Sequence, residues 1–158
     1  MQNKYLKIPI ILALAVFFGF SNSVFSSDDS TRIISLAPAT TEILFALGLD
    51  EEIIAVSESC NYPEAAKAKQ KTGTFSQPNI ERILSLKPDI VFCTGLEQAS
   101  VAAKLKKLKV NVFVSDPKNI GELFKSIREM GRLTNREEEA LKLVEGMEER
   151  MEKVKKQS

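Results

Sequence analysis

The sequence contains no histidine and no tryptophan, and it has only two cysteines. Histidine is the commonest metal ligand and the usual base in Ser-His-Asp and Cys-His catalysis. Its absence excludes imidazole zinc sites and these nucleophilic enzymes. The Gly-rich phosphate loops G-x-G-x-x-G and G-K-[ST] are also absent. We therefore expect a protein that is not an enzyme, with no catalytic residue, no protein-built metal site and no cofactor.

An excess of charge of one sign is missing as well. Lys and Arg total 22 against 21 Asp and Glu, which gives a net charge of +1. Nucleic-acid-binding proteins usually carry a clustered basic excess, so no nucleic-acid partner is expected. The hydrophobic fraction of 44% and the charged fraction of 27% are typical of a globular domain.

The first 26 residues have the three parts of a secretory signal peptide. Lys4 and Lys7 supply a positive region, residues 8–20 form an apolar run, and small or polar residues follow. Cleavage is predicted after Ser26, with Ser23 as the second choice. An uncleaved membrane anchor is the alternative, although a helix over the apolar run would span roughly 20 Å of a hydrocarbon core roughly 30 Å thick. We expect an exported protein.

Removal of this segment leaves a chain long enough for one hydrophobic core. Short, continuous apolar runs predict strands buried on both faces of a parallel sheet, at residues 33–36, 53–56, 90–93 and 110–114. Helical patterns alternate with them, at residues 40–47, 80–86, 97–108 and 120–133. This order predicts an α/β fold, a single lobe whose four-stranded parallel sheet is flanked by helices.

The final segment predicts a long helix. Residues 134–137 have the sequence TNRE, a capping box that would begin a helix at about residue 135. Apolar residues then recur at steps of four and three, namely Ala140, Val144, Met147, Met151 and Val154. A helix over residues 135–157 would be about 35 Å long, more than a small sheet needs for cover. A frayed terminal helix with one solvated face is the alternative.

A set of ordered motifs lies along most of the chain. They are RIISLAPATTE (32–42), LG (47–48), YPEA (62–65), TGTF (72–75), NIERI (79–83), LKPDIV (86–91), FV (113–114) and IREMG (127–131). Together they resemble the N-terminal lobe of ABC-transporter substrate-binding proteins for vitamin B12, haem and iron-siderophores. The resemblance covers nearly all of residues 32–150. It implies a periplasmic binding protein that passes a small metal-chelate ligand to an ABC permease in the membrane.

The resemblance also implies a division of the chain. Family members hold their ligand between two α/β lobes joined by a long helix. Residues 1–26 would be the signal peptide, 27–133 the N-terminal lobe and 134–158 the start of the connecting helix. The chain would then be a truncated receptor, or a single lobe that works with a second lobe or as a homodimer. An exported interaction protein that dimerises through its C-terminal helix is the alternative function.

One wall of such a cleft would leave much of a large ligand exposed to water. Ligand pockets usually bury about 70–90% of the ligand surface. We therefore expect this chain alone to bind its ligand weakly or not at all.

Ligands of parallel α/β sheets bind at the carboxyl ends of the strands. The residues predicted to contact ligand there are Pro38, Thr40, Ser59, Phe75 and Thr94. Alternatively, Thr40 could cap the helix that follows it, and Phe75 could fill a small core of its own loop. The resemblance places Phe75 where the B12-binding member has a ligand-stacking aromatic. That member's other aromatic positions fall on Ser59 and Thr94, which disfavours cobalamin and leaves haem, iron chelates and other corrinoids open.

Two further predictions concern a carboxylate and the cysteines. Glu81 matches the surface carboxylate that docks family members onto arginines of the permease. The alternative is that an acid is found here only because the helix macrodipole favours a negative charge in the first turn. A disulfide between Cys60 and Cys93 is an option in an oxidising compartment. The alternatives are a free thiol packed at Cys93 and a thiolate ligand to haem iron or cobalt at Cys60.

Overall fold

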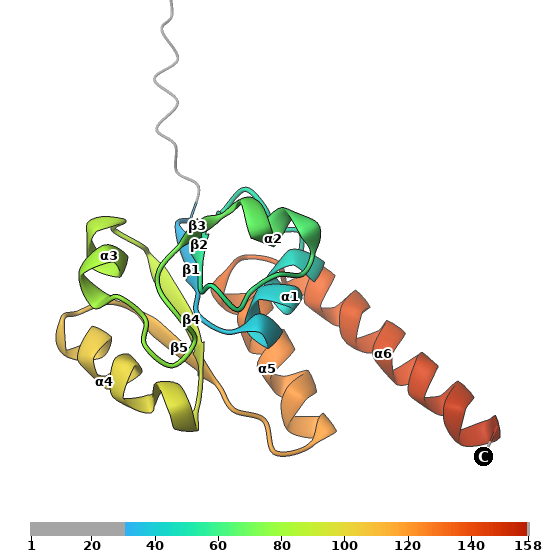
Figure 1. The fold of residues 1–158 in the computed structure, drawn as a ribbon. Helices are drawn as coiled ribbons and strands as arrows, with labels where there is room; N and C mark the ends of the chain where they lie inside the picture. The colour runs from blue at the N-terminus through green and yellow to red at the C-terminus, as the bar shows by residue number, and fades with distance from the viewer. Residues whose placement is uncertain (1–30, 158) are drawn as a thin grey trace, which may run out of the picture.

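The computed structural model describes residues 31–157, so the predicted signal peptide lies outside the described residues. The chain forms a five-stranded parallel sheet with the strand order β3-β2-β1-β4-β5 (Figure 1). The strands are β1 (Ile33–Ser35), β2 (Ile53–Val56), β3 (Gln70–Lys71), β4 (Ile90–Thr94) and β5 (Val112–Ser115). The helices are α1 (Pro38–Ala46), α2 (Glu64–Ala68), α3 (Ile80–Ser85), η1 (Leu96–Gln98), α4 (Ala99–Lys107), α5 (Ile120–Leu133) and α6 (Glu137–Gln157).

The predicted α/β architecture with a parallel sheet is confirmed, but the sheet has five strands and not four. The additional strand, β3, is a two-residue edge strand of polar residues that pairs with Ala55 and Val56 of β2. It has no apolar run that a sequence pattern could detect. A short, polar edge strand also leaves little unpaired backbone open to other chains.

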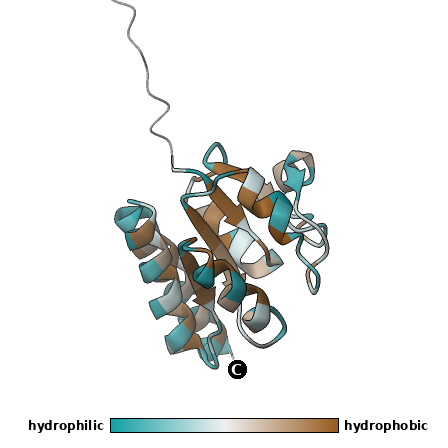
Figure 2. Ribbon diagram, turned by 90° about the vertical axis from the view of Figure 1, so that its left-hand side faces the viewer, coloured by the Kyte–Doolittle hydropathy of each residue, from teal (hydrophilic) through white to brown (hydrophobic). Residues whose placement is uncertain are grey.

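Helices cover both faces of the sheet. Figure 1 shows α3 and α4 on one side of the sheet and α1, α5 and α6 on the other. Successive residues of the central strand β1 point to opposite faces, so Ile33 packs in the cluster with α1, α5 and α6, whereas Ile34 packs in the cluster with α3 and α4. The strands are coloured as hydrophobic between more polar helices in Figure 2. Burial on both faces explains why the strand sequences are continuous apolar runs.

The connection between α5 and α6 differs from the predicted capping box. Thr134 ends α5 and does not cap α6, because its Oγ1 donates to the carbonyl oxygen of Met130 over 2.8 Å. Asn135 follows in the left-handed region at φ 55°. Thr134 is 4% exposed and its hydroxyl faces its own helix, so the hydroxyl is not available to the helix that follows.

The long C-terminal helix is present as α6, and its first two turns belong to the lobe. Ala140 and Val144 are both 0% exposed, and Met147 and Met151 pack partly buried against the same core cluster. Four of the five recurring apolar residues predicted from the sequence therefore pack within the chain. Among residues 31–157 no helix combines the length and apolarity needed to cross a bilayer.

Candidate functional site

The carboxyl ends of the strands meet at one edge of the sheet, and the predicted ligand residues lie in the segments that follow them. Pro38 stands in the first turn of α1 directly after β1, and Ser59 is exposed in the segment after β2. Phe75 is half-buried in the loop after β3, and Thr94 ends β4. In a parallel sheet these segments are brought to the same edge although they are far apart in sequence. The structure thus gathers four of the five predicted positions at this carboxyl edge of the sheet. We call the surface formed by the segments that follow the strands the rim.

The fifth position, Thr40, is turned inward. Its Oγ1 lies 2.8 Å from Ser35 Oγ and 2.9 Å from the carbonyl oxygen of Ala37, and the residue is only 2% exposed. The residue at the N-cap position of α1 is Ala37, and no side chain caps the helix, so the predicted capping role of Thr40 is wrong. Its hydroxyl bonds to the strand end instead, which leaves Thr40 as a support of the rim.

A buried cluster of hydroxyls and one thiol extends this support. Thr41 Oγ1 lies 2.8 Å from Ser35 Oγ and 3.1 Å from Cys60 Sγ, and Ser57 Oγ lies 3.2 Å from the same sulfur. Ser35, Thr41 and Ser57 are 0% exposed, and Cys60 is 1% exposed. The cluster ties the start of α1 to the segment after β2. The partners of the Cys60 sulfur are two hydroxyls of this cluster, and the residue is buried, so the sulfur is not exposed at the sheet edge where it would have to meet a bound haem iron or cobalt.

The disulfide between Cys60 and Cys93 is not formed; both cysteines are free and buried. Cys60 packs in the cluster on the α1, α5 and α6 face, and Cys93 packs in the cluster on the α3 and α4 face. The sheet separates them. Burial raises the pKa of the Cys93 thiol to about 11, against a smaller lowering by Lys106. The thiol is therefore neutral at physiological pH and packs as a small apolar side chain.

Phe75 lies on a loop whose base is closed by backbone contacts. Gly73 and Pro78 form an isolated antiparallel bridge, and Asn79 N donates to the Thr72 carbonyl oxygen over 2.6 Å. Gly73 has φ 101°, and a Cβ built on it would lie 2.8 Å from the Gln77 carbonyl oxygen. A glycine is required at this position because both the backbone angle and the close approach exclude a side chain. The loop therefore presents Phe75 at its tip in a defined place.

Gln98 is the site residue that the sequence did not reveal. Its side chain is 0% exposed, and its Nε2 donates to the carbonyl oxygens of Leu36 at 2.9 Å and Phe75 at 2.7 Å. Its Oε1 accepts from the backbone N–H of Thr94 at 3.0 Å. One amide thus joins the ends of β1 and β4 to the Phe75 loop. In the sequence, a Gln beside Glu97 in a polar stretch looks like any solvent-exposed residue, and no pattern marks it.

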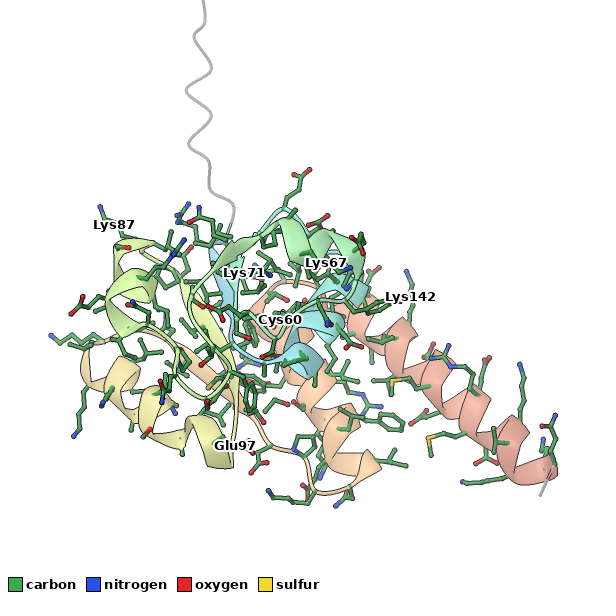
Figure 3. The ribbon with its side chains drawn as sticks, viewed as in Figure 1. Cys60, Lys67, Lys71, Lys87, Glu97 and Lys142 are labelled. Atoms are coloured by element: carbon green, nitrogen blue, oxygen red, sulfur yellow. The ribbon has the colours of Figure 1, made fainter. Side chains whose placement is uncertain are left out.

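The β5 side of the rim is charged. Asp116 and Lys118 follow β5 and form an ion pair of 2.6 Å, and both are exposed. The carboxylate of Asp116 lies directly over Gly95, where any Cβ would collide with it. The exposed Glu97, labelled near the end of β4 in Figure 3, adds a second carboxylate to this side. An apolar ring at Phe75 and mixed charges at the other end of the rim suit a ligand with both apolar and polar surface.

Glu81 lies on the outer surface. It is the second residue of α3, a helix capped by Asn79, whose Oδ1 accepts from the backbone N–H of Arg82 at 2.9 Å. Glu81 is exposed and forms no ion pair with any residue in the range 31–157. The same range holds no group of three or more His, Cys, Asp or Glu side chains arranged for a metal ion.

Comparison with known proteins gives a consistent result. Residues 33–158 match the family described as "Periplasmic binding protein". The chain is 34% identical over 110 residues to the vitamin B12-binding protein of Yersinia pestis (strain Pestoides F), a match that covers 69% of this chain and 39% of that protein. The chain thus spans well under half the length of the curated relatives it matches.

Solved structures show the same likeness. A possible iron-binding (periplasmic solute-binding) protein from Staphylococcus epidermidis superposes with a TM-score of 0.70 at 34% identity, over 78% of this chain and 49% of that chain. The periplasmic vitamin B12-binding protein of Vibrio cholerae superposes with a TM-score of 0.71 at 33% identity, over 80% of this chain and 50% of that chain. In each case the match covers about half of the solved chain.

Proposed function

The chain belongs to the periplasmic binding protein family, and we propose that it is the substrate-binding component of an ABC importer for cobalamin, haem or an iron-siderophore. The observation that carries the proposal is the rim at the carboxyl edge, where Gln98 joins the Phe75 loop to the ends of β1 and β4. The relatives described above as binding vitamin B12 and iron support this ligand class. The proposed role is binding alone, with no chemical step.

The rim residues divide into contacts and supports. Phe75 would stack on the flat part of the ligand, since an aromatic contact adds about 0.5–1.5 kcal/mol beyond the area it buries. Pro38, Ser59 and Thr94 would line the same surface from the neighbouring segments, while Thr40 holds the start of α1 from within. Because Ser59 and Thr94 are not aromatic, this rim offers less stacking area than a fully aromatic cobalamin site. Haem and iron chelates fit it better.

We also propose how the chain is organised and where it acts. Residues 1–26 would be a cleaved signal peptide, residues 27–133 the ligand-binding lobe, and residues 134–158 the start of a connecting helix. A periplasmic location is supported by the two solved structures described above as periplasmic proteins. Glu81, exposed on α3, would dock the lobe on arginines of the permease. An exposed ion pair between this carboxylate and the permease would contribute mainly to the orientation of docking and to the association rate.

A homodimer through α6 has less support. Ala140 and Val144 are fully buried in the lobe, and Met147 and Met151 are partly buried against it. Little of the apolar face of α6 is therefore left for a second copy. Light scattering of the mature chain distinguishes the two arrangements. The proposal expects a monomer, and a stable dimer would favour the interaction-protein alternative.

Equilibrium titration of residues 27–158 with haemin and with cyanocobalamin tests the proposed function. The described residues form one lobe, hence one wall for the ligand, so the expected dissociation constant is about micromolar or weaker. Sub-micromolar affinity of a proven monomer would contradict the expectation that a second wall is needed. Absence of binding to haemin and to cyanocobalamin at a concentration of about 1 mM would exclude these two ligands, and the same titration with a ferric siderophore then tests the third member of the proposed class.

A further inference from the structure

The buried amide of Gln98 makes no contribution to the helix that it precedes. Gln98 occupies the N-cap position of α4, where a side chain commonly accepts a hydrogen bond from the first turn of the helix. No such bond is formed. Its side chain turns instead toward Leu36, Phe75 and Thr94 (2.9, 2.7 and 3.0 Å) and is 0% exposed. The fold of α4 therefore does not explain this residue.

The Phe75 loop depends on Gln98 in a specific way. Its base is fixed by the bridge between Gly73 and Pro78 and by the bond from Asn79 N to the Thr72 carbonyl oxygen. Its tip, residues 74–76, has one hydrogen bond to another element within the described part of the chain, and this is the bond from Gln98 Nε2 to the Phe75 carbonyl oxygen. Loss of the amide would leave the base closed and release the tip.

We propose that Gln98 is the positioning residue of the ligand site. Its amide holds the Phe75 loop against the ends of β1 and β4, so that the aromatic ring is presented at the rim to a planar, metal-chelating macrocycle. The inference rests on the proposed function for the ligand class, but the position of the loop can be measured without a ligand. Gln98 itself does not touch the ligand; it acts through Phe75, Leu36 and Thr94.

The absence of tryptophan provides the means to test this. Phe75→Trp places a single indole at the loop tip, where its emission wavelength and its quenching by acrylamide report how tightly the tip is held. Haem and cobalamin both quench indole emission when bound, so the same signal reports affinity. In this background, Gln98→Met removes all three hydrogen bonds at similar side-chain length. Gln98→Glu keeps the acceptor for Thr94 but, ionised, cannot donate to either carbonyl oxygen.

The matched control is Thr134→Val. It removes another buried side-chain bond to a carbonyl oxygen, from Thr134 Oγ1 to Met130, at the end of α5 and away from the rim. A loss of global stability alone would therefore affect the control and the Gln98 variants alike. Only a positioning role predicts that the loop tip changes in the Gln98 variants and not in the control.

We expect Gln98→Met and Gln98→Glu to shift the indole emission to longer wavelength, to increase acrylamide quenching, and to weaken haemin binding about tenfold. Thr134→Val should lower the denaturation midpoint and leave emission and affinity as in the parent. Unchanged emission in both Gln98 variants, or equal changes in Thr134→Val, would overturn the inference. If the parent binds neither haemin nor cyanocobalamin, these two ligands are excluded, while the emission comparison still decides whether Gln98 positions the loop.

Discussion

Gly131 of α5 and Ala140 of α6 are in such close approach that a Cβ built on Gly131 would lie 2.5 Å from the Ala140 Cβ. The same Cβ would lie 2.8 Å from the carbonyl oxygen of Arg136. Real Cβ atoms do not approach other heavy atoms so closely in a folded core, because interiors are already close-packed. The contact sets the position of the long helix against the lobe, and it depends on a residue with no side chain.

Gly131→Ala is therefore expected to destabilise the protein, in spite of the higher helix propensity of alanine. Overpacking of this kind costs about 1–3 kcal/mol. The matched control is Gly121→Ala in the same helix, where the nearest atom to a built Cβ is Asn119 Oδ1 at 3.4 Å. That substitution should be neutral or stabilise the protein by up to about 1 kcal/mol. Urea denaturation measures both, and equal effects of the two substitutions would contradict the packing described for α5 and α6.

Both cysteines are expected to be reduced and protected in the native protein. Cys60 is 1% exposed and Cys93 is 0% exposed, so native protein should react slowly with a thiol reagent, whereas protein unfolded in urea should show two thiols. Ala103→Cys supplies an exposed thiol on α4 as a positive control for the reagent. If the urea-unfolded, unreduced protein shows no thiol, the disulfide exists and the separation of the cysteines by the sheet is wrong.

Alkaline pH should lower the stability through Cys93. The unfolded thiol has a pKa of 9.0, and burial raises the folded value to about 11. Above pH 9 the unfolded state releases this proton while the folded state keeps it, so the free energy of unfolding falls from about pH 9 to about pH 11. Cys93→Ala should show a shallower decline over that interval when denaturation midpoints are measured at each pH. A decline of the same slope in both proteins would show that Cys93 does not contribute.

Phe75→Ala should weaken ligand binding and leave stability nearly unchanged, because the ring is half-buried and lies at the tip of a loop. Loss of a stacking contact and of the area it buries predicts about tenfold weaker binding of haemin. Leu108→Ala is the control: the residue is 52% exposed and follows α4, which ends at the opposite edge of the sheet. If the two substitutions change affinity equally, Phe75 has no direct role in binding.

Local patterns predicted the strands and helices that contribute most to the core. The apolar runs identified β1, β2, β4 and β5, and the helical patterns identified α1, α3, α4 and α5. The edge strand β3 escaped detection because its two residues are polar and it exists only through pairing with β2. Its existence depends on a contact between segments, which a pattern along the chain does not contain.

The side-chain partners at the rim could not be predicted for the same reason. Thr40 and Thr134 are residue types that often cap helices, but each hydroxyl donates to a carbonyl oxygen three or four residues earlier in the chain. Gln98 is separated by 23 residues from Phe75, to which it donates, and by 62 residues from Leu36. The family motifs pointed to the segments that follow the strands, and the role of these segments in ligand binding stays a prediction. Which side chain holds those segments together is decided by packing alone.

The most direct test of the account is to map the bound ligand on the lobe. Amide ¹H–¹⁵N spectra of residues 27–158 are recorded with and without cyanocobalamin and haemin. The account predicts that changes concentrate in the segments after β1, β2, β3 and β4, with the largest changes around Phe75 and Thr94. Changes confined to α6 or to the amino ends of the strands would contradict the assignment of the ligand to this rim.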